Sequence, residues 1–255
     1  MTTLQVNTAE LCALLADLSH TAPSDPEFGA LAGIVLHTSR GHVGTDPGQT
    51  TLLVGTSTTR TVAGHAYTSC SGYLHEPMLW PIGDVRAALA VLRPLAKADK
   101  AHTTAISRDG ASVVLAEVGD PALFDDLDAP AGTELRFTVG DLTDYPRGIW
   151  ALLGDIHTAS VVFDTDGRAI DAAPRTDLTA AALLPFCRVA RSRGEAIELY
   201  RYHQRRAVLV QIGPAYRGVL MPASYEDGNP SEVTEPPGEV YAPVLPEPVE
   251  PEPST

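Results

Sequence analysis

An internal repeat constrains the fold of this chain more than any single motif does. The segment ALLADLSHTA at residues 13–22 is echoed by ALLGDIHTA at residues 151–159. Each echo follows a short alternating stretch, Leu4–Val6 in the first case and Leu135–Phe137 in the second. Ala and Leu are common in this chain, so chance similarity is the alternative, but the shared Asp, His and Thr favour a duplicated structural unit.

A second pair of segments supports the duplication. Asp84 and Asp177 each open an Ala- and Leu-rich stretch in which basic residues follow a proline at the same spacing: Pro94, Lys97 and Lys100 in the first, Pro185, Arg188 and Arg191 in the second. Two short apolar runs typical of strands follow each stretch, at residues 103–106 and 112–117 and again at residues 196–202 and 207–212. The sequence therefore predicts two consecutive units, each with strands and two helices.

The predicted fold class is α/β of the α+β kind, because strands and helices recur in the same order in both units. Residues 1–128 form the predicted first domain and residues 129–225 the second, with Gly119–Gly132 as the connector. The first helix is predicted around Leu11–Leu18 with Asn7 or Thr8 as its cap, and strands are predicted at residues 28–38 and 50–68. Residues 226–255 carry eight acidic residues and no Lys or Arg, a composition that predicts disorder.

The charge and the cysteines narrow the classes of function. A net charge of −14 argues at first against a nucleic-acid partner, but without residues 226–255 the chain has 24 acidic and 18 basic residues. Cys12, Cys70 and Cys187 lack CxxC spacing, which argues against a thiolate zinc site and favours a reducing cytoplasm. No apolar run approaches the roughly 20 residues that span a bilayer, so we expect a cytoplasmic protein with no membrane partner.

Enzyme signatures are absent from the sequence. It contains no GxxxxGK[ST], GxGxxG, GxSxG or HExxH motif. The turn Asp164–Gly167 starts like a calcium loop but lacks the closing acid, and a plain hairpin turn is the simpler interpretation. Asp125, Asp126 and Asp128 could be imagined as a magnesium site, but an acidic linker is usually solvated. We therefore expect no catalytic residue, metal or cofactor; a small-molecule enzyme with an unrecognised site is the alternative from another class.

The positive signal is a basic stripe on the second predicted helix. Arg86, Arg93, Lys97 and Lys100 fall within about 60° on a helical wheel, while apolar positions lie to one side of it: Val85, Ala88, Leu89, Leu92 and Ala96. A stripe of this kind is most often a solvated face. Its recurrence favours contact with phosphates, and the predicted DNA-binding residues of the second unit are Arg147, Arg188, Arg191 and Arg193. Pro94 and Pro185 predict that each helix is kinked or broken into two short pieces.

Two segments resemble the sliding-clamp family of DNA polymerase processivity factors. The stretch EAIELYRYHQRRAVLVQIGPAYRGVLMP at residues 195–222 is similar to the end of bacterial β clamps, where paired strands close on a strand that ends in Met-Pro. TLLVGTSTTRTVAG at residues 51–64 is similar to the strand and turn before the family's second helix, although Gly55-Thr56-Ser57 stands where the family usually has Ala-Thr-Asp.

The resemblance implies the DNA-clamp fold, in which domains of antiparallel sheets carry helices on the inner face of a ring. Six such domains surround duplex DNA and hold it without sequence preference. Bacterial clamps reach six with two three-domain chains, so a two-domain chain implies a homotrimer, as in the clamps of archaea, eukaryotes and some phages. It also implies that DNA polymerase and a clamp loader dock through short peptides in a pocket formed here by Val219, Leu220, Met221 and Pro222. The simpler reading of these four residues is that they end an edge strand. The alternative function in the same fold is a decoy or partner-binding platform that is not loaded on DNA.

Overall fold

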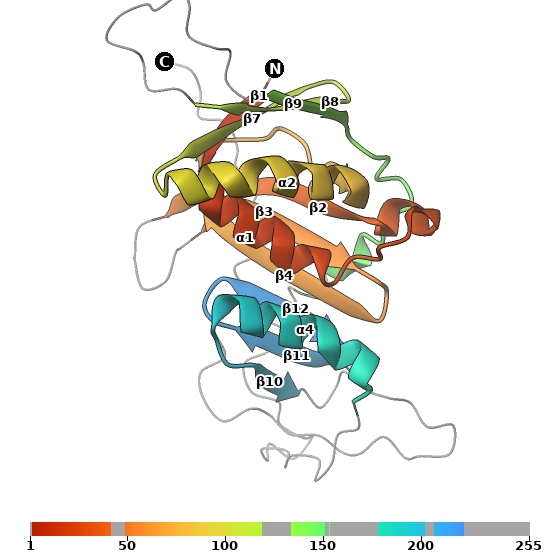
Figure 1. Ribbon diagram of the computed structural model, residues 1–255. Helices are drawn as coiled ribbons and strands as arrows, with labels where there is room; N and C mark the ends of the chain where they lie inside the picture. The colour runs from red at the N-terminus through yellow and green to blue at the C-terminus, as the bar shows by residue number, and fades with distance from the viewer. Residues whose placement is uncertain are drawn as a thin grey trace, which may run out of the picture.

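The computed structural model describes residues 2–41, 49–118, 134–150, 153, 178–201 and 207–221, whose strands form two antiparallel sheets (Figure 1). The five-stranded sheet has, in spatial order, β5 (Ser71–Gly72), β1 (Thr2–Asn7), β7 (Thr103–Asp109), β8 (Ser112–Glu117) and β9 (Glu134–Thr138). The seven-stranded sheet has β10 (Glu198–Arg201), β11 (Val208–Ile212), β12 (Tyr216–Leu220), β4 (Val62–Ser69), β3 (Thr50–Thr58), β2 (Gly33–Gly41) and β6 (Met78–Pro81). The predicted fold class is confirmed.

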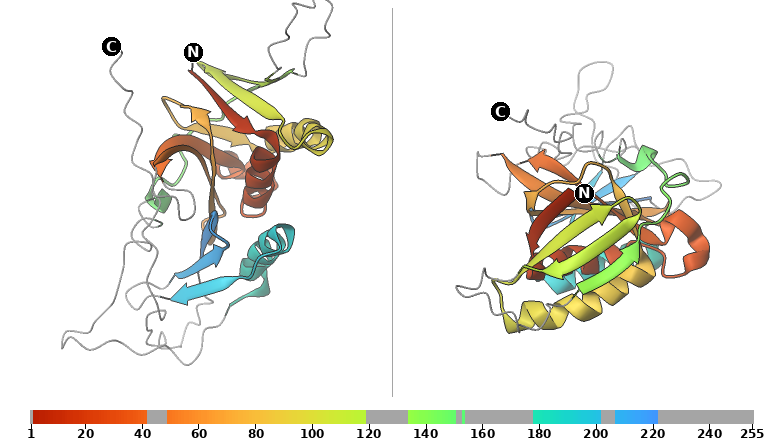
Figure 2. Two further views of the ribbon diagram at one scale, coloured as in Figure 1. Left: turned by 90° about the vertical axis from the view of Figure 1, so that its left-hand side faces the viewer. Right: turned by 90° about the horizontal axis from the view of Figure 1, so that it is seen from above.

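Three helices cover the same side of the sheets. Figure 2 shows α1 (Thr8–Ser19), α2 (Ile82–Ala98) and α4 (Ala180–Arg193) together on this side. α1 packs against α2 and over strands β3 and β4, while α4 packs over β11 and β12. Among the described residues, no helix is long and apolar enough to cross a membrane.

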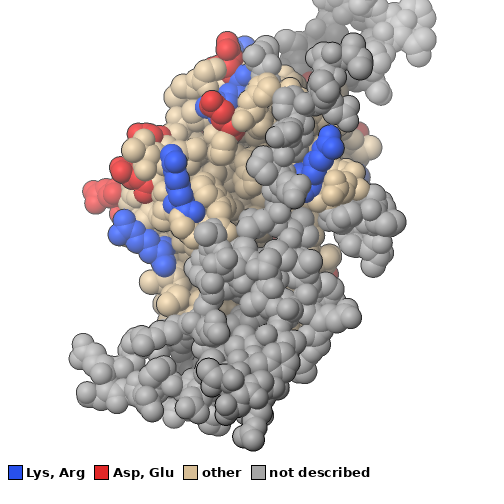
Figure 3. Space-filling view, turned by 180° about the vertical axis from the view of Figure 1, so that it is seen from behind, with Lys and Arg blue, Asp and Glu red and all other residues tan. Residues whose placement is uncertain are grey.

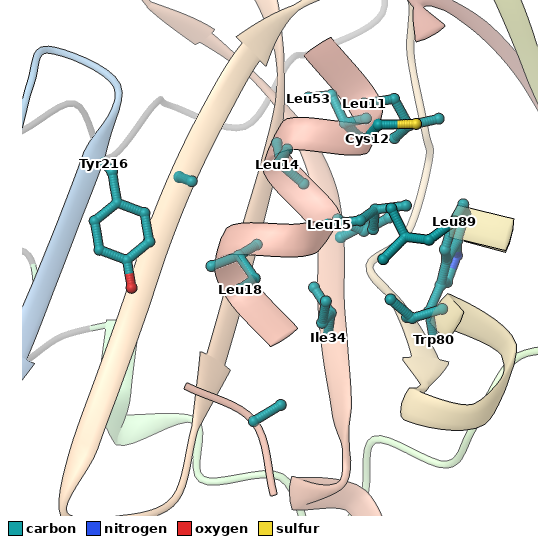
Figure 4. Packing of buried hydrophobic residues seen from close by; sticks show 14 of the residues in the cluster. Leu11, Cys12, Leu14, Leu15, Leu18, Ile34, Leu53, Trp80, Leu89 and Tyr216 are labelled. Atoms are coloured by element: carbon teal, nitrogen blue, oxygen red, sulfur yellow. The ribbon is translucent and has the colours of Figure 1, made fainter. Parts of the chain in front are cut away.

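The first helix forms where the sequence predicts it, and Asn7 is its cap. The Asn7 Oδ1 accepts hydrogen bonds from the backbone amides of Ala9 and Glu10, at 3.0 and 3.2 Å, which satisfies two donors of the first turn. Its apolar stripe is buried against β3, α2 and neighbouring strands: Leu11, Leu14, Leu15 and Leu18, together with Cys12 (Figure 4). The 3.6-residue period therefore fixed both the element and the face that it buries.

Two expectations about local structure are wrong. α2 and α4 each run as one helix through Pro94 and Pro185, so neither is broken into two pieces. Phe28 does not lie in a strand, because Asp25 caps a short 3-10 helix, η1 (Pro26–Leu31), that starts with a proline. The side chain of Phe28 is 58% exposed, and β2 begins only at Gly33.

The repeat is visible in the order of elements after the second helix of each half. Three antiparallel strands follow α2 as β7, β8 and β9, and three follow α4 as β10, β11 and β12. Glu134–Thr138 is thus the third strand after α2, and it pairs with β8. The similar stretch at Leu4–Val6 lies in β1, which has a different place in the sheet, between β5 and β7. Four predicted features lie outside the described residues: the connector at residues 119–132, the domain boundary after Asp128, the hairpin at Asp164–Gly167 and the acidic residues 226–255.

The two halves are joined by backbone pairing between β4 and β12. In this register Gly64 lies opposite Gly218, and both positions face the helices. A Cβ at Gly64 would clash with the hydroxyls of Thr21 and Tyr216, and a Cβ at Gly218 would clash with the Phe186 ring of α4. The glycine pair therefore lets Tyr216 and Phe186 enter one core that is continuous across the junction.

We expect Gly218→Ala to destabilise the fold by about 1–3 kcal/mol, because the added methyl group overpacks the core against Phe186 and the Ala63 carbonyl. The matched control is Gly83→Ala in the first turn of α2, where no atom lies within 4 Å of the new Cβ. This control should be neutral or stabilising by up to about 1 kcal/mol. Urea unfolding measures both, and equal small effects would mean that the junction is not tightly packed.

Candidate nucleic-acid interface

The helical side of the molecule is basic although the chain as a whole is acidic. α1, α2 and α4 together hold six of the 18 Lys and Arg residues but only three acidic residues, Glu10, Asp17 and Asp84. On the opposite side, the basic side chains that can be seen are separated and stand near acidic ones (Figure 3). The three helices therefore carry a local excess of positive charge, which the net charge of −14 conceals.

The stripe on α2 is arranged as its spacing predicts. Arg86, Arg93, Lys97 and Lys100 are exposed, with Lys100 just beyond the end of the helix. Val85, Ala88, Leu89 and Leu92 are buried on the core side, and Ala96 is partly buried. The apolar face of α2 thus packs inward and leaves its cations at the surface.

α4 adds a second group of cations to the same side. Arg188 and Arg191 are exposed on the helix, which ends at Gly194 in the left-handed conformation (φ 69°). Burial lowers the pKa of His20, at the end of α1, and the positive charges of Arg188 and Arg93 lower it further, while Asp17 opposes the shift. Arg93 and Arg188 therefore both act on α1 from neighbouring helices. We call the six exposed cations the basic wall: Arg86, Arg93, Lys97, Lys100, Arg188 and Arg191.

Arg193 does not join the basic wall. Its Nε donates a hydrogen bond to Asp17 Oδ2 at 2.6 Å, and its guanidinium lies 5.6 Å from the centre of the Tyr216 ring. Ser192 Oγ donates to the other oxygen of Asp17 at 2.9 Å. Asp17 is 1% exposed, so it must be neutralised, and Arg193 does this across the junction of the two halves. Sequence spacing could not show this partner, which lies on a distant helix.

Arg147 also lies away from the basic wall. Its neighbours Tyr145 and Ile149 pack with Val35 and Leu79, whereas Ile34 and Leu36 pack in the core beneath the helices. Successive strand residues point to opposite faces, so this segment covers the other side of the seven-stranded sheet. Helical residues follow at Gly148–Trp150 and at Leu153, on the far face from α1, α2 and α4.

An open groove of about 520 Å³ lies where α1 approaches α4 and the end of β4. Its lining includes Glu10, Cys12, Tyr67 and Arg93, together with the Asp17–Arg193 pair. Burial raises the pKa of the Cys12 thiol, which keeps it in its less reactive protonated form, although Arg93 opposes this shift. Among the described residues, no three His, Cys, Asp or Glu side chains form a metal-binding cluster.

The predicted peptide pocket is only partly at the surface. Val219 and Leu220 are buried at 3% and 0% exposure and pack in the core. Their strand, β12, lies between β11 and β4, so it is not the edge strand of the simpler reading. Met221 is 42% exposed, and its backbone amide donates a hydrogen bond to the Thr61 carbonyl at 3.0 Å. Pro222 lies outside the described residues. None of these residues lines the groove between α1 and α4.

With this architecture established, comparison with solved structures identifies the fold. The chain is similar to a protein described as a DNA polymerase III beta subunit from Eubacterium rectale (TM-score 0.58, 8% identity, covering 90% of this chain and 67% of that one). It is also similar to the DNA polymerase III beta subunit of Thermotoga maritima (TM-score 0.56, 13% identity, 89% and 66%). A third match is the DNA polymerase sliding clamp of Caulobacter crescentus (TM-score 0.54, 16% identity, 88% and 65%).

The chain therefore has a sliding-clamp-like fold of the bacterial β kind, and the resemblance predicted from its sequence is confirmed at the level of the fold. It spans about two thirds of the length of the clamps that it matches. No family model and no curated protein sequence matches it.

We expect Arg193→Met to cost about 3–5 kcal/mol of stability, because it leaves the Asp17 carboxylate buried without a partner. Arg191→Met, an exposed neighbour on the same helix, is the matched control and should change stability by less than about 0.5 kcal/mol. The double variant Asp17→Leu/Arg193→Met should recover most of the loss, since neither charge is then left unpaired. Equal costs for Arg193→Met and Arg191→Met in urea unfolding would contradict the structural role of the pair.

Proposed function

We propose that this protein is a sliding clamp without enzymatic activity, which encircles duplex DNA and tethers a polymerase. The observation that carries the proposal is the basic wall on the helical side of a chain that is otherwise acidic. Phosphate contacts of exposed Arg and Lys are weak, sensitive to salt and independent of sequence. These properties suit a ring that is retained on DNA by topology and must slide.

The free edge of β9 supports assembly into a ring. β9 ends the five-stranded sheet and pairs only with β8 among the described strands, while β12, which has the same place after α4, pairs with β4 of the other half. We infer that β9 of one copy pairs in the same manner with the second half of the next copy, head to tail. Three copies with two domains each would make the six-domain ring that the resemblance implies.

Partners would dock beside Met221 on the side away from the basic wall. The exposed thioether of Met221 offers an adaptable apolar surface for a Leu or aromatic anchor of a short peptide. The bond from the Met221 amide to Thr61 holds this side chain next to the turn between β3 and β4. This exposed surface at Met221 is the proposed attachment point for polymerase and clamp loader.

Light scattering should give the mass of three copies of the 27.0 kDa chain, about 81 kDa. We infer a trimer from two units per chain and from the pairing of β9 of each copy with the next copy. A strict monomer at micromolar concentration would exclude the encircling mechanism. A stable dimer would require a ring of a different kind.

Arg93→Glu and Arg188→Glu should each weaken binding of the assembled protein to a short duplex about tenfold at 50 mM salt. The slope of log affinity against log salt should fall by about one for each phosphate that the variant no longer binds. Arg147→Glu is the matched control, because it makes the same charge change on the opposite face of the sheet. Fluorescence anisotropy across a salt series measures all three.

The mass and the melting temperature of each variant should match those of the parent protein. Equal losses of affinity for Arg93→Glu and Arg147→Glu would show that DNA does not use the helical side. Unchanged affinity in every variant would instead favour the decoy or platform function.

A further inference from the structure

This chain contains two regions of opposite charge, the basic wall and the acidic residues 226–255. The basic wall contributes six exposed cations on the helical side, and none of the six forms an ion pair with another described residue. Residues 226–255 contribute eight acidic residues and no basic one. We refer to this part of the chain as the acidic segment.

We propose that the acidic segment binds the basic wall of its own ring and competes there with DNA. The competition rests on the proposed function, whereas the docking of the segment does not. Carboxylates and phosphates make the same charge-assisted hydrogen bonds with Arg and Lys, so a run of acids can occupy the positions that a DNA backbone would take. DNA would then engage the wall only by displacing the segment.

The acidic segment starts close enough to reach the basic wall. Leu220, the last residue of β12, is fully buried in the core beneath the helices. β12 pairs with β4, and α4 and α1 pack directly over these two strands, so the segment departs from the layer behind the wall. A random-coil chain as long as residues 222–252 spans about 30 Å on average and about 100 Å when extended. Such tethering gives an effective concentration on the order of millimolar.

The basic wall is a better site for the segment than the described cations that already pair with an acidic residue. Arg108 already pairs with Glu76, Arg136 pairs with Glu134, and Arg193 pairs with Asp17. An acidic chain at any of these positions would meet a carboxylate beside the cation. Five of the six cations of the basic wall lie on α2 and α4, whose only acidic residue is Asp84, and Lys100 follows α2 beside Asp99. The local charge balance therefore favours the wall.

The chain offers a direct test of docking, because its only two lysines, Lys97 and Lys100, lie on the basic wall. A carbodiimide joins a carboxylate to an amine only where the two are in contact. We expect amide cross-links from Lys97 or Lys100 to acids of the segment, detected by mass spectrometry. High salt or added duplex DNA should suppress them, and mixed heavy and light copies show whether the segment comes from the same chain or a neighbour. Cross-links only to nearby Asp99 would overturn the proposal.

The consequence for DNA is tested in the full chain with Glu247, Glu250 and Glu252 changed to Gln. This variant should bind a short duplex about threefold to tenfold more tightly at 50 mM salt, with the difference lost above about 300 mM. The matched control changes three exposed acids of the body, Glu27→Gln, Asp109→Asn and Asp144→Asn, and shifts net charge equally. Equal gains from both triple variants would overturn the proposal, since net charge alone would then explain the effect.

Failure of this inference can be told apart from failure of the clamp proposal. Cross-links to the segment without DNA binding by any variant would support docking and contradict the clamp function. DNA binding that is sensitive to Arg93→Glu but unaffected by the segment, together with absent cross-links, would support the clamp function and overturn docking.

Discussion

The pairing of β4 with β12 is the interaction on which the rest of the structure depends. It joins strands from the two halves into one seven-stranded sheet and brings Gly64 opposite Gly218, so that no side chain separates the facing layers at this point. Tyr216 and Phe186 fill the space and extend the core of the first half into the second. As a result α4 lies on the same side as α1 and α2, and the basic wall can be continuous.

The Asp17–Arg193 pair crosses the same junction. The basic residues of α4 therefore fall into two groups, one paired with a buried acid and one exposed. Arg193 is 19% exposed and is committed to a buried carboxylate, while Arg188 and Arg191 on the same helix remain exposed. A buried pair stabilises little on its own, but the loss of one partner is costly, so it favours a single arrangement of the two helices. Exposed cations that are free of such pairs can exchange contacts with phosphates at little cost.

Much of the local structure could be predicted from the sequence because short-range physics decides it. The leucine period of α1, the cap at Asn7, the stripe of α2 and the strand at Ser112–Glu117 follow from periodicity and side-chain chemistry. The helices through Pro94 and Pro185 could not be predicted in this way, because packing over the sheet outweighs the missing hydrogen bond. The position of Arg147 depends on which face of the seven-stranded sheet its segment covers. Local sequence patterns do not determine that face.

The sequence by itself determined the repeated order of elements, the α+β class, the resemblance to sliding clamps and the basic stripe on the second helix. These properties depend on spacing along the chain, which is fixed before folding. Only the tertiary structure decided which of the cations share a surface, which one is committed to Asp17, and that Val219 and Leu220 belong to the core while Met221 is exposed. Such distinctions depend on contacts between residues far apart in the chain, since burial and pairing arise only when the two halves meet.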